Sequence, residues 1–120
     1  MKVKTLLSLI CVFCLCLTGC SFLEDRERVN GLLSNEEDKY SLFITGPLDS
    51  ITYEILEEND IRNVNTIRTE NSLQYVQDQY GVLNIERTPA FVVLNDKKVV
   101  YKTYDMEDLF EFLQNNGPTE

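Results

Sequence analysis

The chain has 120 residues, 11 of them basic and 20 acidic, with four cysteines and no histidine or tryptophan. Its length accommodates one domain, and its formal net charge of -9 argues against nucleic acid as a partner, because that kind of binding depends on clustered Lys and Arg. The lack of histidine excludes Ser-His-Asp and Cys-His catalysis and histidine zinc ligands, so the cysteines carry the reactive chemistry that remains open.

The first nineteen residues have the pattern of a secretory signal peptide. Lys2 and Lys4 precede an apolar run over residues 5–17, which is too short for a stable membrane-spanning helix. The run ends in Leu17-Thr18-Gly19-Cys20, which resembles the lipobox of bacterial lipoproteins. This resemblance implies cleavage before Cys20 and modification of that cysteine with diacylglycerol and palmitate. The alternative is an ordinary secretory signal followed by a chance cysteine.

Cleavage before Cys20 would change what the cysteines and the charge mean. Cys11, Cys14 and Cys16 would leave with the signal, so the C-x-x-C spacing at 11–14 belongs to the apolar signal core rather than to a redox or metal site. Loss of Lys2 and Lys4 would take the formal net charge from -9 to -11. A domain this acidic gains nothing from attraction to anionic lipid, so we expect the lipid to be the anchor and the domain to stand off the membrane.

Residues 20–38 are predicted to form the lipidated N-terminus and a charged tether. The stretch from Glu24 to Arg28 carries both signs of charge, and residues 36–38 are all acidic. Val29, Leu32 and Leu33 recur at helical spacing and allow two turns of marginal helix ending near residues 34–35. A solvated spacer explains this composition better than an acidic metal site.

Residues 39–117 are predicted to form one folded α/β domain. Apolar runs rich in branched and aromatic residues indicate strands, and apolar residues at helical spacing indicate helices. The expected elements are a strand at 40–45, a helix from Leu48 to about residue 58, a strand at 61–68, a helix at 73–80, a strand at 90–94, a strand at 99–104 and a helix from Met106 to about residue 116. The order β-α-β-α-β-β-α predicts a mixed four-stranded sheet with flanking helices.

Local signals mark the ends of these elements. Asn71 or Ser72 is expected to cap the helix at 73–80, with Gly81 as its stop, and Asp105 is expected to cap the final helix. Residues 95–97 are predicted to form the turn of a hairpin. The acidic residues at 105–111 fit the first turns of a helix, where they complement its dipole, better than a metal or acid–base site.

The second half of this pattern resembles the thioredoxin fold. Thr88-Pro89 directly precedes the strongest strand, as the cis-proline loop of that family does, and a hairpin and an amphipathic helix follow. Thr45-Gly46-Pro47-Leu48 stands between the first strand and the first helix, where thioredoxins carry Cys-Gly-Pro-Cys. The resemblance covers roughly residues 39–116 and implies a thioredoxin-like fold with a cis Thr88–Pro89 bond.

Both cysteine positions of that motif hold other residues, Thr45 and Leu48. Disulfide exchange needs a thiolate and a resolving thiol, so the resemblance implies a redox-inactive relative without a cofactor or a bound metal. In the family the two loops form a surface that holds extended polypeptide. Carried over, the resemblance implies a partner-binding surface made of Thr45, Gly46, Pro47, Leu48, Arg87, Thr88 and Pro89. The alternative is that Gly46-Pro47 is a simple turn and Thr88-Pro89 a simple strand start.

The function expected from these observations is that of a non-catalytic lipoprotein of the bacterial cell envelope. It would be held on the extracytoplasmic side of the membrane by Cys20 and would bind an envelope protein, a peptide or peptidoglycan. One alternative is a structural or peptidoglycan-associated small lipoprotein. A thiol–disulfide oxidoreductase is disfavoured because no thiol follows Cys20. Tyr101 and Tyr104 offer a further contact surface, with one of the two expected in the core.

Overall fold

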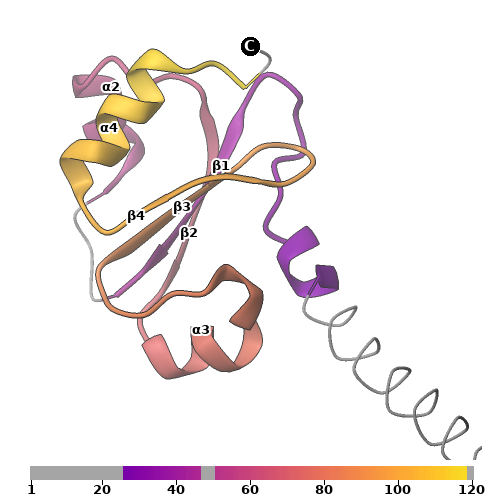
Figure 1. Cartoon of the computed structure of the whole chain (residues 1–120). Helices are drawn as coiled ribbons and strands as arrows, with labels where there is room; N and C mark the ends of the chain where they lie inside the picture. The colour runs from indigo at the N-terminus through magenta and orange to yellow at the C-terminus, as the bar shows by residue number, and fades with distance from the viewer. Residues whose placement is uncertain (1–25, 47–50, 119–120) are drawn as a thin grey trace, which may run out of the picture.

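A computed structural model of the chain describes residues 26–46 and 51–118 (Figure 1). The predicted signal peptide, the lipidated Cys20, and Pro47 and Leu48 of the predicted binding surface lie outside the described residues.

The described residues form a small α/β domain with a mixed four-stranded sheet and flanking helices, and the predicted order of elements is confirmed. The elements are β1 (Tyr40–Thr45), α2 (Tyr53–Glu58), β2 (Val64–Glu70), α3 (Leu73–Gln79), the 3-10 helix η1 (Gly81–Leu83), β3 (Ala90–Leu94), β4 (Val99–Thr103) and α4 (Met106–Asn115). The short helix η1 was not predicted, since three residues are too few to show a period.

The strands lie in the order β2-β1-β3-β4. β1 is parallel to β2 and antiparallel to β3, and β3 is antiparallel to β4. The parallel pair is joined through α2, whereas the antiparallel β3–β4 pair is joined by the predicted turn. In that turn the Asn95 side chain accepts hydrogen bonds from the backbone N–H groups of Lys97 and Lys98, both at 2.8 Å. β1 is thus an inner strand, buried over its whole length.

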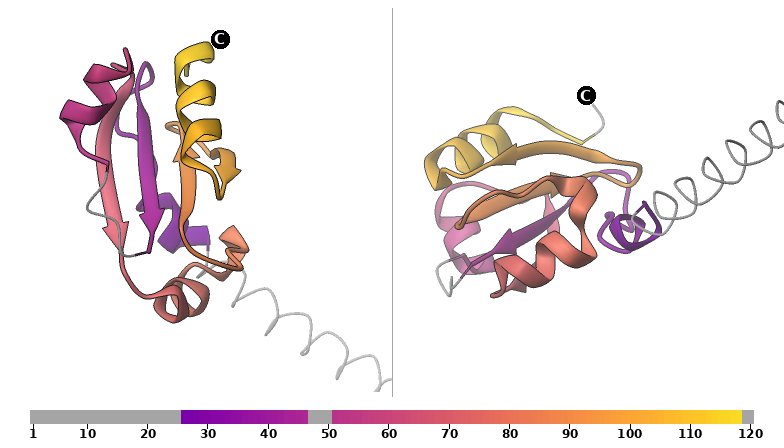
Figure 2. Two further views of the ribbon diagram at one scale, coloured as in Figure 1. Left: turned by 90° about the vertical axis from the view of Figure 1, so that its left-hand side faces the viewer. Right: turned by 60° about the horizontal axis from the view of Figure 1, so that its bottom comes forward.

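Alternate residues of the inner strands supply two separate hydrophobic clusters, one on each face of the sheet. On one face, Leu42 and Phe91 pack with α2 and α4 through residues such as Leu109. On the other face, Phe43 and Val92 pack with α3, η1 and residues 29–33. The right-hand view of Figure 2 shows the strands lying between α4 and α3.

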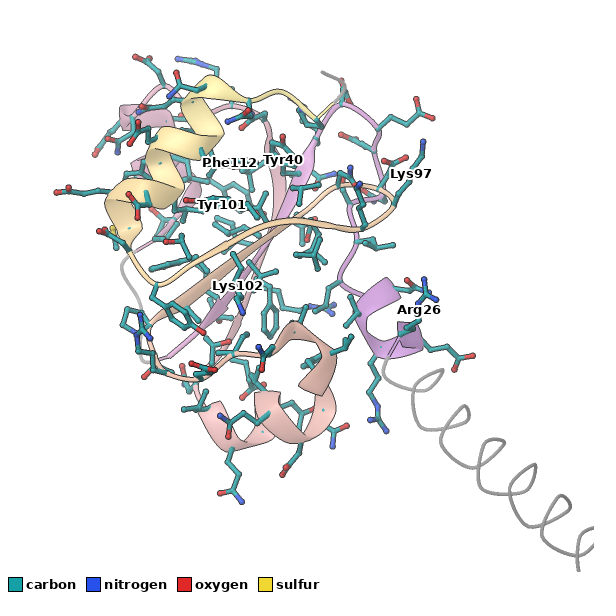
Figure 3. All side chains as sticks on the ribbon, viewed as in Figure 1. Arg26, Tyr40, Lys97, Tyr101, Lys102 and Phe112 are labelled. Carbon is teal, nitrogen blue, oxygen red and sulfur yellow. The ribbon has the colours of Figure 1, made fainter. Side chains whose placement is uncertain are left out.

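An aromatic contact holds α4 against the sheet. The Phe112 ring stacks on Tyr101 of β4, with ring centroids 4.3 Å apart and planes 4° from parallel. Phe112 also meets Tyr40 of β1 at 5.9 Å, and the three rings lie together in Figure 3. Tyr101 therefore contributes to the packing of this face, as was expected of one of the two tyrosines.

The predicted helix caps are confirmed, but the predicted start of one helix is wrong. Ser72 rather than Asn71 caps α3, accepting a hydrogen bond from the Tyr75 N–H, and Asp105 caps α4. The helix predicted from Leu48 begins only at Tyr53, after Thr52. Ile51 precedes this helix yet is buried, so its place in the apolar pattern reflects packing rather than helical geometry.

The edge of the sheet formed by β2 is covered by a side chain from α2. The Tyr53 hydroxyl donates to the Asn65 carbonyl at 3.3 Å and accepts from the Ile67 N–H at 3.2 Å. Such bonds occupy backbone groups that an edge strand would otherwise offer to another chain. Tyr53 itself remains 52% exposed, so the cover is a single ring on the surface.

Residues 26–38, the described part of the predicted tether, partly pack on the domain. Residues 26–30 are helical, and Leu32 is only 3% exposed. The Ser34 N–H donates to the Asn95 carbonyl at the β3–β4 turn, at 3.0 Å. Over residues 29–34 the segment is thus part of the domain rather than a solvated spacer. Its helix ends at Asn30, earlier than the expected end near residues 34–35.

Candidate functional site

The candidate site lies where β1 ends, between its two neighbouring strands. Thr45, the last residue of β1, is opposite Glu70 of β2 and Ala90 of β3. The N–H of the next residue, Gly46, donates to the Glu70 carbonyl at 2.9 Å. The backbone at the end of β1 is thereby held by strand pairing on both sides.

Gly46 lies directly against the Thr88–Pro89 peptide. Its φ is 125°, a conformation that side chains rarely adopt, and a Cβ there would be 3.1 Å from the Thr88 Cβ and 3.5 Å from the Pro89 Cα. Glycine is therefore required both by the backbone and by the close approach. The Thr88–Pro89 bond is cis, as expected from the resemblance. Two segments far apart in the sequence, Gly46 and Thr88-Pro89, meet here as predicted.

Thr45 lies beneath this surface rather than on it. Its side chain is 0% exposed, and its Oγ1 has no hydrogen-bond partner among the described residues. Asn63 and Asn65 also have a buried oxygen without a partner, but their amide nitrogens are hydrogen-bonded. A buried hydroxyl without a partner costs about 1–3 kcal/mol of stability.

Arg87 is positioned by an aromatic residue that the sequence did not assign to the site. Its guanidinium carbon lies 4.0 Å from the centroid of the Tyr104 ring, a cation–π contact. The Tyr104 hydroxyl accepts a hydrogen bond from the Glu86 N–H at 3.1 Å. Tyr104 therefore fixes the segment before the cis peptide from two directions. Its spacing in the sequence indicated only a contact or core role.

Lys102 contacts an earlier part of the same loop. Its Nζ donates to the carbonyls of Asn84, at 2.8 Å, and Leu83, at 3.3 Å, and it also lies 5.9 Å from the Tyr104 ring (Figure 3). An ammonium group at the last turn of η1 offsets carbonyls that lack a helical partner. No local pattern pointed to this role, because Leu83 and Lys102 meet only through the fold.

The solvent-facing part of the site is short and chemically simple. Arg87, Thr88 and Pro89 are exposed, whereas Gly46 is buried behind them. The described part of the site thus offers a hydroxyl, a guanidinium and backbone groups, with no thiol or imidazole among them. Such groups can hydrogen-bond to a polypeptide or attract a carboxylate. In the described part of the chain, no three His, Cys, Asp or Glu residues come together as a metal site would require.

A scan against protein-family models, a search of curated proteins and a search of solved structures each found no match. Among the helices of residues 26–46 and 51–118, none combines the length and the apolar character needed to cross a membrane.

Proposed function

We propose that the protein is a redox-inactive, thioredoxin-like binding module that holds an extended segment of a partner polypeptide. The observation that carries this proposal is the contact between Gly46 and the cis Thr88–Pro89 peptide at the end of β1. The order of elements and the mixed sheet agree with the same resemblance. Thr45 stands where disulfide exchange would need a cysteine, so the proposed activity is binding without chemistry.

The proposed binding mode is strand addition beside the cis-proline loop. A partner backbone would pair with main-chain groups next to Pro89, and side chains would choose among partners. Arg87, held over Tyr104, would meet a carboxylate or carbonyl of the partner. The resemblance also assigns Pro47 and Leu48 to this surface. Thr45 would support the surface from beneath, because its side chain is buried.

The proposed location is the extracytoplasmic side of the cell membrane of a bacterium, with Cys20 as the lipidated residue. The support is the apolar run over residues 5–17 followed by Leu17-Thr18-Gly19-Cys20. In this proposal the partner is an envelope protein or peptide that approaches the anchored domain from outside the bilayer.

Site-specific photocrosslinking tests the binding surface. A photoreactive residue at the exposed Thr88, in the lipidated protein and in native membranes, should give a discrete crosslinked product. The same residue at the exposed Gln114 of α4 serves as the control and should give none. A charge introduced as Leu48→Asp should abolish the Thr88 product. Equal labelling from both positions, or no product from Thr88, would contradict the proposal.

An insulin-reduction assay tests the redox part of the proposal. The mature domain should show no turnover above background, because no cysteine follows Cys20. Clear turnover would mean that the protein is an oxidoreductase after all. The restored variant Thr45→Cys/Leu48→Cys provides a matched comparison on the same backbone.

A further inference from the structure

A basic groove lies where the N-terminal segment joins the domain. It has a volume of about 310 Å³ and is bordered by residues 26–33, by η1 and by the β3–β4 turn. Its charged lining residues are Arg26, Lys97 and Lys98, and no carboxylate is among the described residues that line it. The remaining lining is mostly apolar and includes Val82 and Val99. The described lining of this groove is therefore basic, in a chain with 20 acidic residues.

The groove and the candidate site lie at opposite ends of the sheet. The β3–β4 turn that supplies Lys97 and Lys98 follows Leu94, which pairs with Ser41 at the start of β1. Gly46 follows Thr45 at the other end of the same strand, about 20 Å away for a strand of this length. Figure 3 shows Arg26 and Lys97 on the side of the domain where the N-terminal segment leaves it.

The chain itself limits how far this groove can be from the membrane. Arg26 is six residues after Cys20, so the two are at most about 20 Å apart even if the chain between them is fully extended. This step rests on the proposed lipidation of Cys20. If that residue carries the anchor, the end of the domain bearing Arg26 lies next to the bilayer.

We infer that the basic groove seats the anionic head groups of the membrane in which the protein is anchored. Lys97 and Lys98 are exposed and present ammonium groups that suit phosphate oxygens. Val82, 44% exposed, offers an apolar contact at the level of the glycerol backbone. The expectation that the domain stands off the membrane follows from its net charge, whereas contact depends on the charge of the one face that meets the lipid.

This contact orients the domain. With the groove against the head groups, the end of β1 that carries Gly46 and Thr88-Pro89 faces away from the membrane. A partner in the surrounding space would then reach the candidate site without competing with the lipid. The anchor alone would set the distance of the domain from the bilayer without setting its orientation.

Reporter cysteines test this orientation, because the mature chain has no cysteine other than the modified Cys20. The lipidated protein carries a fluorophore at Val82→Cys, beside the groove, or at Asn71→Cys, just beyond β2 at the site end. Each is reconstituted in phosphatidylcholine vesicles, with or without about one third phosphatidylglycerol, together with a head-group quencher. We expect quenching at Val82→Cys only in the anionic vesicles and none at Asn71→Cys in either.

Two charge-reversal variants provide the matched comparison. Lys97→Glu/Lys98→Glu should reduce the equilibrium constant for the contact, obtained from the quenching at Val82→Cys, at least tenfold, since each basic residue near an anionic surface strengthens the contact about fivefold. Arg62→Glu/Arg68→Glu changes the net charge by the same amount, but in β2 and just before it. In this variant the fluorophore at Val82→Cys should be quenched as strongly as in the parent protein. Sodium chloride at about 0.5 M should weaken the quenching at Val82→Cys in the parent protein, because it screens exposed charges.

The outcomes separate this inference from the proposed function. Equal quenching of Val82→Cys in neutral and anionic vesicles, or equal loss in both charge-reversal variants, would overturn the groove as a lipid contact. Vesicle sedimentation of the same samples reports the anchor independently. Protein that fails to sediment with either vesicle would instead overturn the lipidation of Cys20.

Discussion

The two ends of β1 differ in how well local interactions satisfy the chain. At the end near Tyr40, side chains satisfy the backbone locally: Ser34 Oγ bonds to both the carbonyl and the N–H of Glu36, and Asn95 closes its turn. At the other end, Gly46 has a positive φ and the Thr45 hydroxyl has no partner in the described part of the chain. Departures from local preference tend to gather at functional sites, which favours the second end as the site of binding.

The comparison also shows why net charge describes this molecule poorly. The chain is acidic overall, yet the groove near the N-terminal segment is lined by three cations. A groove between β4 and α4 is lined instead by Asp108 and Glu111, with no basic residue among its described lining. Different faces of the same domain would therefore meet membranes and partners differently.

The largest expected effect comes from Leu32, at the end near the N-terminal segment. Leu32→Ala should lower the free energy of unfolding by about 2–5 kcal/mol, because Leu32 is buried in the cluster on the α3 face. Chemical denaturation of the mature domain measures this change. Leu33→Ala, at a half-buried neighbour, should cost less. An unchanged denaturation midpoint for Leu32→Ala would mean that residues 29–34 form a spacer that does not stabilise the domain.

Gly46→Ala should produce the next largest effect, at the site end. A side chain at φ 125° costs about 1–3 kcal/mol, and the new methyl group must also displace Thr88, 3.1 Å away. Stability should fall, and the Thr88 photocrosslink should weaken with it. Gly81→Ala is the control, because nothing lies within 4 Å of its added Cβ, and its stability should change by less than about 1 kcal/mol. Equal stability of the two variants would contradict the close approach.

Thr45→Val should have the smallest effect and the opposite sign. It removes a buried hydroxyl that has no partner among the described residues and keeps the shape of the side chain, so unfolding should cost about 1 kcal/mol more. Thr45→Ser keeps the hydroxyl, loses a methyl group and should destabilise. A clear loss of stability in Thr45→Val would show that the hydroxyl is bonded in the folded protein.

The elements that the sequence predicted best are those defined by local chemistry. The strand at 90–94, the cap Asp105 and, as one of two alternatives, the cap Ser72 were predicted because continuous apolar runs and short polar side chains act within a few residues. The start of α2 was predicted too early because Ile51 is buried by tertiary packing before the helix begins. Periodicity alone does not separate these two causes.

The sequence predicted only part of the site, because the rest depends on tertiary packing. The meeting of Gly46 with Thr88-Pro89 was expected from a family resemblance. Thr45 was assigned to the binding surface, whereas the position of β1 between β2 and β3 buries its side chain. The roles of Tyr104 and Lys102 were also missed, since their partners precede them by about twenty residues and are reached only across the β3–β4 hairpin.

The sequence by itself determined the order of the elements and the absence of any thiol beyond Cys20, because both depend on residue type and local pattern. The tertiary structure decided which residues share a surface. Arg26 lines the same groove as Lys97 and Lys98 only because residues 26–34 pack beside the β3–β4 turn. Gly46 meets Pro89 only because β1 and β3 are neighbours in the sheet. Long-range strand pairing brings these groups together, and a one-dimensional pattern does not record it.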